Sequence, residues 1–76
     1  MSKILDLTAK QAIARSVSHD EIVHVDGDNQ MHLDLSAWCD DSVQTRGTEP
    51  GQSLTEYWGT TDDDQDWRVH VHGHES

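Results

Sequence analysis

The spacing of apolar residues changes near residue 20, from the period of a helix to the alternation of β-strands. Upstream of this change, Thr8 and Gln11 stand three residues apart, as the N-cap and the third helical residue of a capping box do. We therefore expect a helix over residues 9–18, with one face small enough to pack closely on a sheet. That face consists of Ala9, Ala12, Ile13, Ser16 and Val17.

Downstream of the change, the first alternating pair of segments predicts a β-hairpin. Residues 21–25 and 31–35 alternate apolar and polar side chains, and residues 26–29 (Asp-Gly-Asp-Asn) suit a tight turn between them. His24 and His32 would then point away from the core. The side chains expected to point inward are Val23, Val25, Met31, Leu33 and Leu35.

A second hairpin is predicted near the end of the sequence. Residues 54–60 and 67–72 are rich in β-forming side chains, and the acidic residues 61–66 join them. Trp67, Val69 and Val71 would face the core, and Arg68, His70 and His72 would face the other way. Between the hairpins, residues 36–53 predict a short strand or an irregular crossing followed by a loop.

These elements predict a single α+β domain over residues 1–76. We expect one N-terminal helix packed on a small antiparallel sheet of three to five strands built from two hairpins. A chain of 76 residues that is 33% hydrophobic and lacks Phe forms only a small core, and a homodimer would supplement its stability. The sequence contains neither a membrane span nor a signal-peptide core, so we expect a cytoplasmic protein.

The negative charge is concentrated in the middle of the chain. The formal net charge is −10, and thirteen of the fifteen carboxylates lie between residues 20 and 66, with Arg46 as the only cation there. We expect ten carboxylates at turns and outward strand positions to form a partner-binding surface. These are Asp26, Asp28, Asp34, Asp40, Asp41, Glu56, Asp62, Asp63, Asp64 and Asp66. A rigid array of this kind can imitate DNA phosphates and occupy a groove lined by Lys and Arg, whereas it would repel nucleic acid itself.

Other chemistry finds less support in the sequence. Neither Asp-rich turn is a calcium loop of the EF-hand type, because the sixth position is Trp67 or Met31 rather than Gly. Cys39 is followed by two aspartates that would raise its pKa, so we interpret it as a small core residue rather than a nucleophile. We expect no enzyme activity and no cofactor.

The alternating histidines near the end of the sequence leave a second hypothesis open. On a continued strand, His70, His72 and His74 would project from one side and could bind zinc, nickel or copper. A strand that simply exposes its histidines to solvent is the other interpretation. Protonation of several histidines near pH 6 would also reduce the negative charge and weaken electrostatic binding.

The chain resembles the small, acidic anti-CRISPR and other DNA-mimic proteins of bacterial mobile genetic elements such as phages and plasmids. The resemblance lies in size, charge, the expected helix and sheet, and the segment from Glu56 through Asp62–Asp64 to Val69. It implies a non-enzymatic inhibitor that blocks the basic DNA-binding groove of a type I CRISPR effector complex in the host cytoplasm. The alternatives are the histidine metal site and a generic acidic protein-interaction module.

Overall fold

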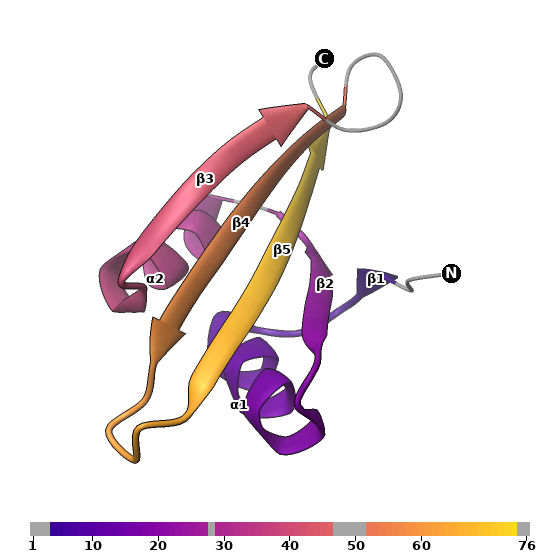
Figure 1. Cartoon of the computed structure of the whole chain (residues 1–76). Coiled ribbons are helices and arrows are strands. Elements are labelled where there is room, and N and C mark those ends of the chain that lie inside the picture. The colour runs from indigo at the N-terminus through magenta and orange to yellow at the C-terminus, as the bar shows by residue number, and fades with distance from the viewer. Residues whose placement is uncertain (1–3, 28, 47–51, 75–76) are drawn as a thin grey trace.

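The computed structural model describes residues 4–27, 29–46 and 52–74. Its elements are, in chain order, β1 (Ile4–Leu5), α1 (Ala9–His19), β2 (Ile22–Asp26), α2 (Asn29–Trp38), β3 (Asp41–Arg46), β4 (Gln52–Thr60) and β5 (Asp66–His74). The strands form one five-stranded sheet in the order β1-β2-β5-β4-β3. Both helices pack on the same face of this sheet (Figure 1). The predicted α+β class is therefore confirmed.

Helix α1 follows the prediction and ends one residue later than expected, at His19. The capping box is present, because the Thr8 hydroxyl accepts from the Gln11 N–H at 3.2 Å and the Gln11 side chain accepts from the Thr8 N–H at 3.0 Å. The small side chains of Ala9, Ala12 and Ser16 are buried. Their size lets the helix approach the sheet closely.

The first predicted hairpin is wrong, since residues 29–38 form a helix rather than a strand. Met31 and Leu35 are buried, but Leu33 is 66% exposed. Positions four apart share a face in a helix, and they also share a face in a strand, so this pair fits both patterns. Gln30 donates to Asp34 at 2.8 Å, a contact between residues four apart that only the helix allows.

Strand β2 pairs in parallel with β1 and β5 instead of turning back on itself. The sheet is therefore mixed rather than antiparallel, and only β4 runs against its neighbours. The predicted turn at residues 26–29 is replaced by the passage from β2 to α2, in which Gly27 donates to the His72 carbonyl at 2.9 Å. Asp28 lies outside the described residues.

The second hairpin is confirmed and is longer than predicted. Strands β4 and β5 pair along nine residues each, and β3 adds an edge strand where a short strand or crossing was expected. Trp67, Val69 and Val71 are buried, together with Tyr57 from β4 and the valines of β2. The side chain of Trp67 lies against Gly59, where a Cβ atom would come within 2.8 Å of the indole ring.

The two faces of the sheet therefore differ. One face packs against α1 and α2 and holds the hydrophobic core. Neither helix packs on the other face, which we call the uncovered face. By strand alternation it carries His24, Glu56, Trp58, Arg68, His70 and His72. Within the described ranges, neither helix is long and apolar enough to cross a membrane.

Candidate functional site

The turn between β4 and β5 presents exposed aspartates on an ordered backbone. Thr61 and Gln65 exchange contacts across it, with the Thr61 N–H donating to the Gln65 carbonyl at 2.9 Å and the Gln65 N–H donating to the Thr61 hydroxyl at 3.2 Å. Asp64 adopts φ 61° and donates to the Thr61 carbonyl at 3.0 Å. The side chains of Asp62, Asp63, Asp64 and Asp66 are all exposed. The closed turn thus limits how far these carboxylates can move.

A second pair of carboxylates lies beside the same turn, at the junction of α2 and β3. Asp40 accepts from the Thr60 hydroxyl at 3.2 Å, and its N–H donates to the Trp58 carbonyl at 2.9 Å. Thr60 is the last residue of β4, so Asp40 lies next to the start of the turn. Asp41 caps its own neighbour by accepting from the Ser42 N–H at 2.8 Å.

A third pair, Asp20 and Glu21, follows α1 and was not among the predicted site residues. Together with Asp66 and Arg68, these two residues line an open cavity of about 280 Å³. Glu21 also lies 3.6 Å from the guanidinium of Arg15. The sequence shows their charge, but only the parallel pairing of β2 with β5 brings them beside Asp66.

The topology places these three junctions at the same end of the sheet. Strands β2, β3 and β5 begin there, and β4 ends there. In Figure 1 this is the end at which the β4–β5 turn lies. We call it the acidic end and define it by Asp20, Glu21, Asp40, Asp41, Asp62, Asp63, Asp64 and Asp66, all of which are exposed.

The remaining predicted carboxylates do not join the acidic end. Asp26 lies at the opposite end of β2. Asp34 lies on α2, where it accepts from Gln30 and lines a separate cavity of about 300 Å³. Glu56 lies on the uncovered face of the sheet, 2.9 Å from His70. The structure thus places six of the predicted ten together, with Asp28 outside the described residues.

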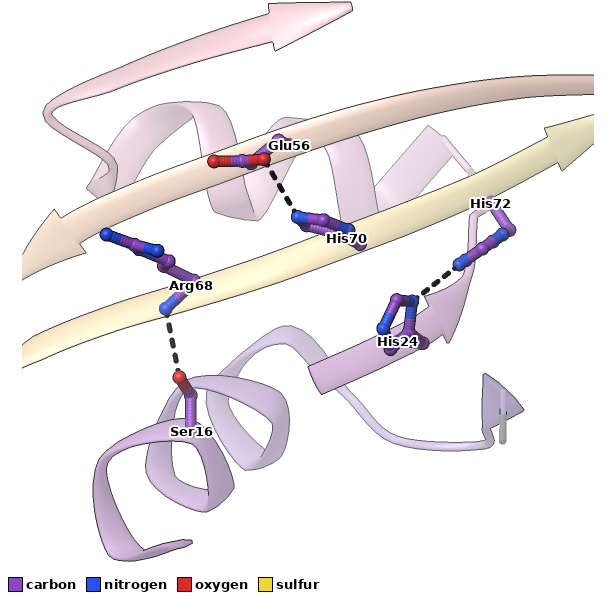
Figure 2. A network of polar contacts seen from close by, with 6 residues as sticks. All are labelled: Ser16, His24, Glu56, Arg68, His70 and His72. Carbon is purple, nitrogen blue, oxygen red and sulfur yellow. Dashed lines mark hydrogen bonds and ion pairs between the residues drawn. The ribbon is translucent and has the colours of Figure 1, made fainter. Parts of the chain in front are cut away.

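The uncovered face also holds a cluster of three histidines, His24, His70 and His72, which Figure 2 shows together. His24 Nδ1 and His72 Nε2 form a hydrogen bond of 2.8 Å, and the ring centres of His24 and His70 are 5.1 Å apart, edge to face. Burial lowers the pKa of His24, and the neighbouring His70 and His72 lower it further.

This cluster differs from the predicted set of His70, His72 and His74. His24 was expected to point outward, but its position beside β5 depends on a parallel pairing that the sequence pattern did not reveal. Nothing is described of the His74 side chain. Among the described residues, no group of three or more His, Cys, Asp or Glu is arranged to hold a metal ion.

His32 and Cys39 belong neither to the histidine cluster nor to the acidic end. His32 lies on α2 and bonds to the Tyr57 hydroxyl at 2.8 Å, so it does not share the face of His24. Cys39 is partly buried against the core, and its Sγ donates to the Ser36 carbonyl at 3.6 Å. Burial raises the pKa of Cys39, and Asp41 and Asp40 raise it further, which disfavours the thiolate.

Comparison with protein-family models, with curated proteins and with solved structures finds no match to this chain.

Proposed function

We propose that this chain is a non-enzymatic binding protein that occupies a Lys- and Arg-lined surface of a nucleic-acid-binding protein by imitating DNA phosphates. The observation that carries the proposal is the acidic end, where exposed carboxylates from three junctions lie at the same end of the sheet. A basic groove that binds DNA gains free energy by releasing counterions, and a fixed array of carboxylates obtains the same gain.

The hydrogen bonds that hold the backbone of the acidic end support a DNA mimic rather than a charged surface that only increases solubility. The β4–β5 turn is closed by its own hydrogen bonds, and Asp40 is tied to Thr60. Carboxylates held close together repel one another and lower the stability of so small a domain. Because the backbone of the turn is already closed, binding a cationic groove does not have to order it and loses less entropy.

The resemblance to anti-CRISPR proteins suggests the first partner to test, a subunit of a type I CRISPR effector complex in the cytoplasm of a bacterial host. In this proposal the acidic end takes the place of target DNA on that subunit. Glu56, on the uncovered face of the sheet, lies outside the contact, since its carboxylate is already bonded to His70.

The proposal predicts that the protein displaces a target duplex from a type I effector complex. The triple variant Asp62→Asn/Asp63→Asn/Asp64→Asn should need a concentration at least about tenfold higher for the same displacement, because charge pairs at the interface are lost. Displacement is measured by fluorescence anisotropy of labelled duplex. Raising the salt concentration should weaken binding of the wild type more steeply than binding of the variant.

The matched control is Asp6→Asn/Asp26→Asn/Asp34→Asn, which removes the same charge away from the acidic end. We expect it to compete within about threefold of the wild type, as remote charges are screened by salt. Equal losses in both variants would mean that net charge alone acts, as in a generic acidic interaction module. Undiminished competition by the first variant would rule out mimicry by this end.

A further inference from the structure

The three histidines of the uncovered face lie across the boundary between β2 and β5. His24 belongs to β2, and His70 and His72 belong to β5, so the hydrogen bond between His24 and His72 joins the two strands through their side chains. In the sheet order β1-β2-β5-β4-β3, the strand pairing that joins β1 and β2 to the other described strands is that of β2 with β5. A side-chain contact here therefore helps to hold one edge of the sheet to the rest.

This contact depends on how many protons the two rings carry. The facing atoms are His24 Nδ1 and His72 Nε2, and a hydrogen bond between them uses one proton. The bond survives one additional proton on the pair, because the second ring still offers a lone pair. When both rings are imidazolium, both facing nitrogens carry N–H groups, and the attraction is replaced by repulsion.

Charged groups from β4, β2 and β5 face the pair. From β4, Glu56 faces the cluster, but its carboxylate is bonded to His70 at 2.9 Å. From β2 and β5 themselves, Asp26 and Arg68 share the face by alternation. Asp26 is exposed at the end of β2 and is the register partner of His72. From β1, the side chain that shares this face is apolar Ile4.

We propose that the hydrogen bond between His24 and His72 is a proton-sensitive contact, and that protonation of both rings loosens β1 and β2 from β5. Acidification then weakens the fold at this boundary, independently of any binding by the acidic end. The lowered pKa of His24 means that the folded protein resists protonation of this ring, as the proposal requires. The unfolded chain takes up a proton near the ordinary histidine value of 6.5, whereas the folded chain resists it, so stability falls as the pH drops through 6.5 and below.

The test replaces the titrating rings by amides that cannot titrate. Asn places an amide near the position of Nδ1, and Gln places one near Nε2, so His24→Asn/His72→Gln can keep a hydrogen bond without the proton. Urea unfolding is followed by tryptophan fluorescence at about pH 7.5 and about pH 5.5, which bracket the ordinary pKa of histidine and avoid most carboxylate titration.

We expect acidification to raise the unfolding equilibrium constant of the wild type by about fivefold or more, and that of the double variant by much less. The control His19→Gln changes an exposed histidine at the end of α1 and should respond as the wild type does. An equal pH response in the double variant and the wild type would overturn the proposal, as would a wild type that does not respond.

A second measurement keeps the proposal testable if the double variant does not fold. An NMR titration of the wild type reports the protonation of each imidazole separately. We expect His24 to titrate below its ordinary value of 6.5. A midpoint at or above that value would overturn the proposal.

Discussion

Ser16 illustrates how one small side chain joins the helix to the sheet. Its hydroxyl donates to the Glu21 carbonyl at 2.7 Å and accepts from the Arg68 N–H at 2.9 Å, and the residue is 3% exposed. Figure 2 shows the second of these bonds between α1 and β5. A single hydroxyl thus satisfies a donor and an acceptor of the main chain that come from two different segments.

We predict that Ser16→Ala lowers the free energy of unfolding by about 2–3 kcal/mol, because two partly buried backbone groups lose their partner. Urea unfolding measures the change. The matched control Ser18→Ala alters an exposed position of the same helix and should change stability by less than about 0.5 kcal/mol. Equal effects of the two substitutions would show that the hydroxyl contributes nothing beyond helix propensity.

At this scale the sequence predicts local contacts but not distant ones. The capping box of Thr8 and Gln11 spans three residues, so its pattern can be read directly. Ser16 was expected on the packed face, yet its bond to Arg68 connects residues 52 apart along the chain. The bond between His24 and His72 was missed for the same reason.

Among the elements, α2 departs most from expectation. Its apolar residues alternate like those of a strand, and only the exposure of Leu33 beside the burial of Met31 and Leu35 identifies the inward face. A sequence pattern cannot separate these cases, because both periods bring Met31 and Leu35 to one face. Packing of α2 over β4 and Tyr57 resolves the ambiguity in favour of the helix.

We predict that Leu35→Ala lowers the free energy of unfolding by about 2–5 kcal/mol, because it leaves a cavity in the core. Leu33→Ala should lower it by less than about 0.5 kcal/mol, since that side chain is exposed. Urea unfolding of both variants provides the measurement. Comparable losses from both would indicate that residues 29–38 form the strand that alternation suggests.

For the whole molecule, the fold concentrates a charge that the sequence distributes over many residues. The net charge of −10 can be read from the composition, but the acidic end exists because three separate junctions lie at the same end of a mixed sheet. The predicted hairpins would have placed Asp26 and Asp34 in a comparable role. The parallel pairing of β2 with β5, which joins distant parts of the chain, instead leaves Asp26 and Asp34 away from the acidic end.

We predict that adding sodium chloride from about 20 to about 200 mM raises the free energy of unfolding of the wild type, because it screens repulsion between exposed carboxylates. Urea unfolding measures the rise without adding further ions. The variant Asp62→Asn/Asp63→Asn/Asp64→Asn should gain less from salt and be more stable than the wild type at low salt. A wild type destabilised by salt would contradict this account.

The parallel pairing of β2 with β5 also affects how the chain assembles. The β4–β5 hairpin closes through one short turn, whereas the contact between His24 and His72 closes a loop of 48 residues. Closing a long loop costs chain entropy before its contacts form, so pairings of high contact order come late in folding. This topology therefore favours early formation of the hairpin and late docking of β1 and β2, and the strands that dock last are also those that local opening releases first.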